Sequence, residues 1–264
     1  MSKKFNALVI DNQNEKFTRE IKELDTASLK DGNVLVKIDY SSLNFKDALI
    51  LNNGGRIVKN YPFVPGIDFS GTVEESDDGK FKKNDKVILT GFRVGEVYYG
   101  GFSQYAKVNS DFLVKLPNTL TTSKAMMMGT AGLTALLCAF AVKAKEELLM
   151  GTKVKDVLVT GATGGVGSFA VMALNKMGYD VHAVTGKKDK HEYLKKLGAK
   201  NILDRKEFSG ESKLLEKGLW DCVVDTVGGE SLTKILVQTK PGGIVALPGN
   251  AGGNKISTNV MPFV

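Results

Sequence analysis

The sequence predicts an α/β protein in which an all-β unit comes first and a parallel sheet flanked by helices follows. Three observations lead to this prediction. Short segments rich in Val, Ile and aromatic residues, separated by Gly, Asn, Asp and Pro, fill residues 1–118. An apolar stretch of helical composition follows at 121–144. From Lys155 onward, strand-like and helix-like segments alternate, which is typical of a parallel sheet with right-handed crossovers.

The individual elements follow from the apolar segments and from the turn residues between them. In the first unit we expect strands at 6–12, 33–44, 66–76, 85–91, 102–108 and 112–117. In the second unit we expect strands at 156–160, 180–185, 201–204, 222–227 and 243–249. Helices should run from a glycine turn to Met177, over 190–197 until Gly198, and near 231–239. The change from strand-like segments to an apolar segment of helical composition places the junction between the units near residues 118–125.

Composition narrows the class of protein. Apolar residues make up 42% and charged residues 25% of the chain, which is the balance of a globular protein with a real core. We find no run near the ~18 apolar residues that span a bilayer, and the N-terminus resembles a first strand more than a signal peptide. Two cysteines and two histidines provide no cluster of zinc-ligand spacing. We therefore expect no metal, no membrane partner, buried free thiols and a cytoplasmic location.

The net charge of +7 favours anionic ligands without indicating nucleic acid. Nearly all basic residues are lysines, because the chain has only four arginines, Arg19, Arg56, Arg93 and Arg205. Proteins that recognise base edges and phosphates rely on arginine forks, and no basic stretch here is interleaved with aromatic residues. We therefore expect no nucleic-acid partner, and we consider nucleotide phosphates suitable ligands.

A glycine turn after the first strand of the second unit indicates a dinucleotide site. Residues 157–160 (VLVT) form the strand, and GATGGVG follows at 161–167. Ala162, Gly164 and Gly167 occupy the three small positions of the dinucleotide fingerprint, with Ala in place of the first Gly. The plain alternative is a tight turn without a ligand. If the site is real, the backbone amides that face the pyrophosphate are those of Thr163, Gly164, Gly165 and Val166.

The end of the next strand indicates which dinucleotide is bound. The residue that contacts the ribose lies about 20 positions after the glycine turn, where NAD sites place an acid. This chain has Thr185, Gly186 and Lys187 there, which suit the 2′-phosphate of NADP; the alternative is an ordinary basic turn. The nearest acid, Asp189, is expected to form a capping box with Glu192.

The strand count leaves the second unit short. A doubly wound sheet in the order 3-2-1-4-5-6 would lack its last strand after residues 243–249. We therefore expect either a fold shorter than usual or a piece of a longer protein.

Seven collinear segments carry a resemblance to a known family. They are SSLNFKDAL (41–49), YPFVPGIDFSGTV (61–73), ILTGFRVGEVYYGGFSQYAKV (88–108), KAMMMGTAGLTALLC (124–138), VTGATGGVGS (159–168), GKKDKHEYLKKLGA (186–199) and VDTVGG (224–229). In these segments the chain resembles the N-terminal four-fifths of a zinc-free medium-chain dehydrogenase/reductase, most closely the acrylyl-CoA reductase group, whose members are also labelled quinone oxidoreductases. The resemblance implies a GroES-like β-barrel catalytic domain at 1–122 and an incomplete NADP-binding Rossmann domain at 123–264.

The resemblance also implies chemistry without zinc. Zinc-dependent relatives carry metal-binding Cys and His in the catalytic domain, whereas the matching loops here contain Asn44 and Phe45, and Ile67 and Asp68. Without a Lewis acid, hydride delivery to an activated C=C bond is easier than oxidation of an alcohol. We therefore expect an NADPH-dependent oxidoreductase acting on CH–CH groups, which reduces a short 2-enoyl-CoA such as acrylyl-CoA to propionyl-CoA.

Residue roles come from the same resemblance. Phe45, Asn250 and Val264 would lie at the nicotinamide end of NADPH, and Arg205 beside the adenine and its phosphate. The family usually has Tyr where this chain has Phe45, so the phenol that could donate a proton is absent. Asn44 and Tyr98 are the remaining catalytic candidates besides solvent, and the alternative for each is structural: a turn-stabilising amide and a packed ring. For Asp68 we favour a structural hydrogen-bond acceptor.

Two other functions stay open at this point. The first is an NADPH:quinone or enone oxidoreductase on the same scaffold, and the second is a nucleotide-binding protein without catalysis. The resemblance also allows a homodimer, because the terminal sheet strands form the subunit contact in many relatives.

Overall fold

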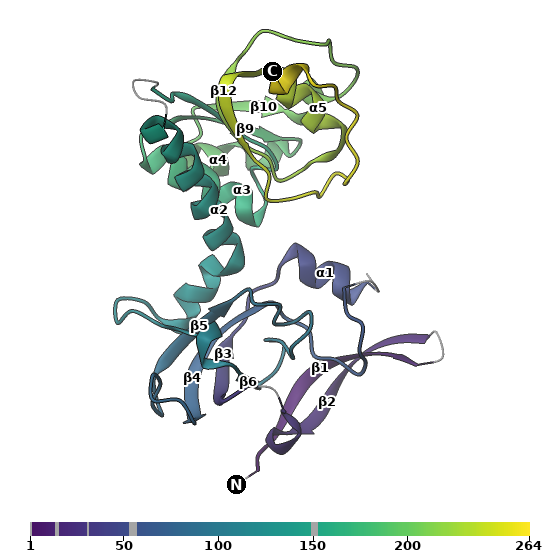
Figure 1. Ribbon diagram of the computed structural model, residues 1–264, viewed down its shortest axis with the longest axis vertical. Coiled ribbons are helices and arrows are strands. Elements are labelled where there is room, and N and C mark those ends of the chain that lie inside the picture. The colour runs from purple at the N-terminus through teal and green to yellow at the C-terminus, as the bar shows by residue number, and fades with distance from the viewer. Residues whose placement is uncertain (1, 14–15, 31, 53–56, 149–152) are drawn as a thin grey trace. The chain divides into compact units, whose positions relative to one another are not determined.

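The computed structural model describes residues 2–13, 16–30, 32–52, 57–148 and 153–264 (Figure 1). They form two compact units, Met1–Thr130 and Ala131–Val264. The predicted α/β class is confirmed. The division lies within one helix, α2 (Thr122–Leu148), so the boundary between residues 122 and 123 stays a prediction.

An antiparallel sheet forms the centre of the first unit. Its strands are β3 (Val34–Tyr40), β4 (Asp68–Ser76), β5 (Lys86–Thr90), β6 (Tyr105–Val108) and β7 (Val114–Lys115), in the order β6-β3-β4-β5-β7. Val36 on β3 pairs with Val73 on β4, and Phe69 on β4 pairs with Leu89 on β5. All four side chains are buried in one core cluster, which is what alternating apolar residues on paired strands produce.

Three features of the first unit differ from the sequence prediction. Strand β1 (Lys4–Gln13), which corresponds to the predicted strand 6–12, pairs antiparallel with β2 (Lys16–Asp25). The sequence analysis missed β2 because the polar and charged residues of this strand hide its alternation. Strand β3 ends at Tyr40, not at Asn44, and helix α1 (Phe45–Leu51) follows. The unit is therefore not all-β. Two 3₁₀ segments, Thr26–Ser28 and Ser110–Phe112, complete it.

Helix α2 corrects the statement that no segment is apolar enough to cross a membrane. An 18-residue window within Thr122–Leu148 has a mean hydropathy of 1.9, so this helix is long and apolar enough to cross a membrane by length and composition alone. Its side chains Ala135, Ala139 and Val142 are fully buried against the sheet of the second unit, and 44% of the window is buried. Inside α2, Gly129 leaves helical geometry (φ 49°, ψ −154°), so the helix bends there.

The second unit is a parallel five-stranded sheet. Its strands are β8 (Asp156–Val159), β9 (Asp180–Thr185), β10 (Asn201–Asp204), β11 (Trp220–Val224) and β12 (Thr239–Ala246). They lie in the order β10-β9-β8-β11-β12, which is 3-2-1-4-5 in chain order. The helices are α3 (Gly165–Lys176), α4 (His191–Lys196) and α5 (Gly229–Val237), with 3₁₀ segments at Lys188–Lys190, Arg205–Phe208 and Met261–Phe263.

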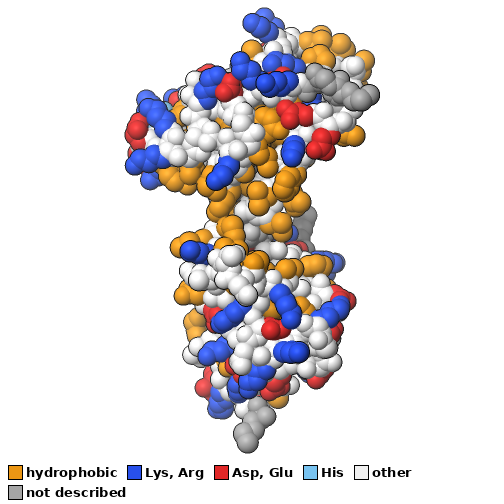
Figure 2. Space-filling model, turned by 90° about the vertical axis from the view of Figure 1, so that its left-hand side faces the viewer, with side chains coloured by type: hydrophobic (Ala, Val, Ile, Leu, Met, Phe, Trp, Pro, Cys, Tyr) orange, Lys and Arg blue, Asp and Glu red, His pale blue; other side chains and the backbone are white. Residues whose placement is uncertain are grey.

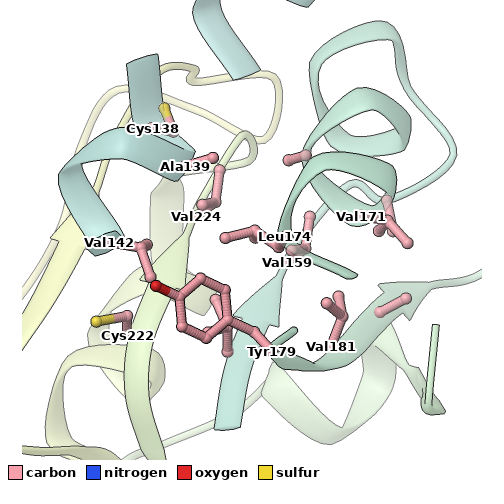
Figure 3. Packing of buried hydrophobic residues seen from close by; sticks show 14 of the residues in the cluster. Cys138, Ala139, Val142, Val159, Val171, Leu174, Tyr179, Val181, Cys222 and Val224 are labelled. Atoms are coloured by element: carbon pink, nitrogen blue, oxygen red, sulfur yellow. The ribbon is translucent and has the colours of Figure 1, made fainter. Parts of the chain in front are cut away.

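Alternating residues of the central strands face two separate cores. Val157 and Val159 on β8 pack with α2, α3 and α4 on one face, where the Cys138, Leu174 and Tyr179 side chains gather (Figure 3). Leu158 packs on the opposite face with Ile235 of α5. The two covered faces explain why the strands are almost continuously apolar.

The predicted capping box of Asp189 and Glu192 is wrong. Asp189 lies inside the 3₁₀ segment Lys188–Lys190, so it does not have the extended backbone that a helix cap requires. Helix α4 starts after Lys190 without a side-chain cap, and Glu192 instead accepts from Lys195 Nζ at 2.9 Å.

Candidate functional site

The glycine turn connects β8 to α3 as the fingerprint predicts. Gly164 occupies the N-cap position and α3 begins at Gly165. A Cβ on Gly167 would lie 2.3 Å from the Gly161 carbonyl oxygen and 2.8 Å from the Ala162 Cα, so only glycine permits this close approach of helix and strand. At Gly164 a Cβ would meet only the Gly161 oxygen, at 3.2 Å. A Cβ at Gly164 would therefore need only a small shift of the Gly161 carbonyl.

The amides of the turn are not all available to a phosphate. The Gly164 amide donates to the Gly161 carbonyl at 2.8 Å, so it is occupied within the turn. The amides of Gly165 and Val166 belong to the first turn of α3, where backbone N–H groups have no intrahelical acceptor. An anion at this turn would therefore find its N–H donors at the positive end of the helix and not at the Gly164 amide.

The end of β9 brings two cations to the same place. The buried Thr185 hydroxyl oxygen accepts from the Lys187 amide at 3.1 Å, which shapes the turn after the strand. Arg205 comes from the 3₁₀ segment after β10 and lies over Gly186, since a Cβ on Gly186 would be 2.7 Å from Arg205 Nε. Both the Lys187 and the Arg205 side chain are exposed. The Gly186 backbone, the Thr185 hydroxyl and the cationic side chains of Lys187 and Arg205 are thus adjacent.

These residues line one cavity of about 390 Å³ at the carboxyl ends of the strands. This location and size are those of a small-molecule site in an open parallel sheet. Lys187 and Arg205 are the only charged residues among the described residues of its lining, so no acid faces the space. The lining comprises Thr160, Gly161, Thr163, Val184, Thr185, Gly186, Lys187, Arg205, Phe208, Val227, Ser231, Ala251 and Gly252.

Three acids that are close in sequence to residues of the lining, Asp204, Glu207 and Asp225, have other hydrogen bonds. Asp204 accepts from the Lys206 amide and Glu207 from the Asp204 amide, both at 2.9 Å, so these two carboxyls cap the segment that carries Arg205. On the other side, buried Asp225 accepts from the Thr160 hydroxyl and from the Gly228 amide at 2.8 Å. This second cluster, which the sequence analysis missed, ties the loop after β11 to the end of β8.

The structure brings together only some of the predicted cofactor residues of the second unit. Thr163, Thr185, Gly186, Lys187 and Arg205 line the cavity, and Asn250 directly precedes its lining residue Ala251. Val264 instead lines a larger space of about 810 Å³ beside β12 and residues 261–263. The glycine turn, through Gly161 and Thr163, and both cations adjoin the smaller cavity.

In the first unit, Asn44 has a structural position. Its side-chain amide donates to Asp68 Oδ2 at 3.0 Å and to Ser42 Oγ at 3.1 Å, and its backbone amide donates to Asp47 Oδ2 at 2.8 Å. Asn44 also occupies the N-cap position of α1. Both hydrogens of the amide group are thereby engaged. Burial raises the pKa of the adjacent Asp47.

Phe45 and Tyr98 differ in how far their side chains are exposed. Phe45, the first residue of α1, is 56% exposed. Tyr98 is half-buried and its ring packs beside Phe112, with ring centroids 5.7 Å apart. Glu96 of the same loop accepts from Lys46 Nζ at 2.9 Å, which joins the loop to α1.

The loops around Asn44 do not suit a zinc ion. No group of three or more His, Cys, Asp or Glu side chains with metal-binding geometry occurs among the residues that the structure describes. Asp68, the buried carboxyl at this position, accepts five hydrogen bonds from Ser42, Asn44 and Thr130. Its oxygens are therefore already engaged by protein donors.

An antiparallel β unit followed by a parallel sheet with a glycine turn after its first strand is the architecture of a medium-chain dehydrogenase/reductase. Residues 30–118 match the family model of the alcohol dehydrogenase GroES-like domain, and residues 165–264 match that of the zinc-binding dehydrogenase. The chain belongs to the zinc-free medium-chain dehydrogenases/reductases, in the group of acrylyl-CoA reductases and quinone oxidoreductases.

Three similar proteins support this assignment. The chain is 48% identical to acrylyl-CoA reductase AcuI of Ruegeria pomeroyi, over 98% of this chain and 79% of that protein. It is 46% identical to the yhdH oxidoreductase from Salmonella enterica, whose crystal structure is a complex with NADP; the TM-score is 0.92, covering 98% and 79% of the two chains. It is 41% identical to Bacillus subtilis yhfP, crystallised with NAD bound, with a TM-score of 0.92 over 99% and 79%.

Proposed function

We propose that this protein reduces the C=C bond of a short 2-enoyl-CoA, such as acrylyl-CoA, with NADPH and without zinc. The Ruegeria relative is named for this reaction, and the identity extends over nearly the whole of the present chain. The cavity that contains Lys187 and Arg205 but no acid is the observation that carries the cofactor assignment.

The choice of NADPH follows from the chemistry of the cavity. Among relatives one structure holds NADP and another holds NAD, so the residues of this chain must decide. A 2′-phosphate requires cations and hydrogen-bond donors, and an unesterified NAD ribose favours a carboxylate. Lys187, Arg205 and the Thr185 hydroxyl meet the first requirement, and the described lining contains no carboxylate for the second. The amides that begin α3 would hold the pyrophosphate.

The reaction needs few contributions from the protein. When bound, NADPH would supply a hydride to the β-carbon of the enoyl thioester, whose carbonyl oxygen would take up the negative charge. Phe45 would pack against the nicotinamide, and Asn250 would lie near it. Because both amide hydrogens of Asn44 are engaged, we propose that Asn44 orients the start of α1, and that solvent or Tyr98 delivers the proton to the α-carbon.

Two further properties belong to this proposal. The lysines and arginines on the face shown in Figure 2 are spread over both units, so we propose no nucleic-acid partner. We also propose a homodimer, which the resemblance to the family allows. We also place the protein in the cytoplasm. Sedimentation at micromolar concentration tests the dimer, and a monomer only would contradict it.

Parallel turnover tests the proposed function. Purified protein with NADPH is given acrylyl-CoA in one series and a simple quinone in the other. We expect acrylyl-CoA to be the better acceptor by kcat/KM. Quinone reduction that is faster by orders of magnitude would favour the quinone reductase instead. NADPH binding without turnover of either acceptor would indicate a nucleotide-binding protein without catalysis.

A further inference from the structure

One buried carboxyl in the first unit accepts far more hydrogen bonds than its neighbours. Asp68 has no exposed surface. Its Oδ1 accepts from the Ser42 amide at 2.9 Å. Its Oδ2 accepts from four donors: Ser42 Oγ at 2.6 Å, Thr130 Oγ1 at 2.8 Å, the Thr130 amide at 2.9 Å and Asn44 Nδ2 at 3.0 Å. We call this group, Asp68 with Ser42, Asn44 and Thr130, the Asp68 cluster.

The Asp68 cluster joins three segments that are distant in sequence. Ser42 and Asn44 belong to the loop before α1, Asp68 begins β4, and Thr130 follows the bend of α2. A Cβ on Gly129 would lie 2.5 Å from Ser42 Oγ and 3.0 Å from Asp68 Oδ2, so the bend and the cluster fit only with glycine there. The loop, the strand and the helix bend are thus fixed as one arrangement.

The cluster acts directly on the start of α1. Asn44 is the N-cap residue of that helix, and Phe45 is its first residue. The Phe45 ring is exposed, and hydrogen bonds of Asn44 to Asp47 and Asp68, which are partly buried, fix the backbone on its N-terminal side. The fixed backbone sets the direction in which the Cα–Cβ bond of Phe45 leaves α1, and the exposed ring is accessible to a cofactor or substrate.

We propose that Asp68 is a positioning residue of the reductase, which holds Phe45 and the Gly129 bend of α2 in the arrangement needed for hydride transfer. The proposal rests on the proposed function, in which Phe45 packs against the nicotinamide. In this proposal Asp68 acts through its hydrogen bonds to Asn44, Ser42 and Thr130.

An isosteric substitution tests the cluster without changing its volume. In Asp68→Asn, an NH₂ group must replace one carboxyl oxygen, and both oxygens face donors. In the less unfavourable orientation the new NH₂ group faces the Ser42 amide, which is the donor to Oδ1. In the opposite orientation the NH₂ group faces the four donors to Oδ2. Thr130→Val is milder, because it removes one hydroxyl donor and keeps the backbone bond. Thr130→Ser keeps the hydroxyl and serves as its conservative counterpart.

A matched control separates positioning from stability. Ser110 is a buried serine of the same unit whose hydroxyl donates to Asp78 Oδ2 at 2.5 Å, outside the Asp68 cluster. Ser110→Ala therefore also removes a partly buried hydroxyl–carboxyl hydrogen bond, together with the one that Ser110 Oγ accepts from Asn33 Nδ2 at 3.3 Å. Four quantities are measured for every variant: the unfolding midpoint, the Kd for NADPH, kcat with acrylyl-CoA, and the circular dichroism of bound NADPH in the nicotinamide absorption band.

We expect Asp68→Asn and Thr130→Val to lower kcat, the former by about tenfold or more, because small displacements of positioning groups are costly. Both should change the nicotinamide dichroism and leave the Kd for NADPH within about threefold, since the second unit binds the nucleotide. Thr130→Ser and Ser110→Ala should keep the wild-type kcat and dichroism.

Wild-type kcat and dichroism in folded Asp68→Asn and Thr130→Val would overturn the proposal, as would a Thr130→Ser variant that behaves like Thr130→Val. If Asp68→Asn does not fold, Thr130→Val and its serine counterpart decide. If the wild type binds NADPH without reducing acrylyl-CoA, the proposed function fails, and the dichroism alone still tests the positioning role of Asp68.

Discussion

Removing the Lys187 cation gives a prediction whose size follows from the structure. Lys187 lines the cavity, and its side chain is exposed. A hydrogen bond between charged groups contributes about 1.5–3 kcal/mol, and solvent reduces this at an exposed site. We therefore expect Lys187→Ala to weaken NADPH binding by about 1–2 kcal/mol, which is roughly 5–30-fold in Kd. NADH lacks the 2′-phosphate, so its Kd should change by no more than about twofold.

The assay is titration of NADPH and NADH by intrinsic nucleotide fluorescence, with calorimetry for the weaker complexes. Lys188→Ala is the matched control, because Lys188 is an exposed neighbour of the same charge that does not line the cavity. Arg205→Ala should resemble Lys187→Ala. Equal losses of NADPH and NADH affinity in Lys187→Ala, or equal effects of Lys187→Ala and Lys188→Ala on NADPH, would refute the assignment of the 2′-phosphate to this turn.

Two other predictions concern stability and packing. Gly167→Ala should lower the free energy of unfolding by about 1–3 kcal/mol in urea titrations, because the new Cβ would overlap the Gly161 oxygen. Gly164→Ala, the control, should change it by no more than about 1 kcal/mol. Equal losses in the two variants would contradict close packing at Gly167. Burial, together with Glu146, raises the pKa of Tyr179 from 10.0 to about 12. The folded state then binds this proton more tightly than the unfolded state, so the stabilisation is complete below pH 10 and decreases towards pH 12, by up to about 1.4 kcal/mol per pH unit. The stability of the wild type relative to Tyr179→Phe should therefore fall over pH 10–12, and a constant difference would contradict the raised pKa.

Local patterns made the nucleotide site predictable from the sequence. The strand, the glycine turn and the helix are contiguous, so their pattern is visible within residues 157–176. Strand β9 runs parallel to β8, so Thr185–Lys187 at its end lie at the same edge of the sheet as the glycine turn. Arg205 required the resemblance to a family, because its approach to Gly186 depends on the separate 3₁₀ segment after β10.

Contacts between distant residues could not be predicted in the same way. Thr130 lies 62 positions from Asp68 and Thr160 lies 65 from Asp225, and nothing in a sequence pattern pairs them. The available signal was a lone acid between apolar neighbours, which indicated a buried acceptor at Asp68 but not its donors. Helix α1 was missed for a related reason: it is only seven residues long, and its cap depends on the Asp68 cluster.

Transfer of deuterium from NADPH tests the central claim most directly. NADPH labelled at the transferable C4 position is incubated with the protein and acrylyl-CoA, and the product is analysed by mass spectrometry and NMR. Our account predicts propionyl-CoA that carries one deuterium on its β-carbon, with the α-carbon proton drawn from solvent or a side chain in exchange with it. Recovery of unlabelled acrylyl-CoA, while the same preparation oxidises labelled NADPH with a quinone, would contradict it.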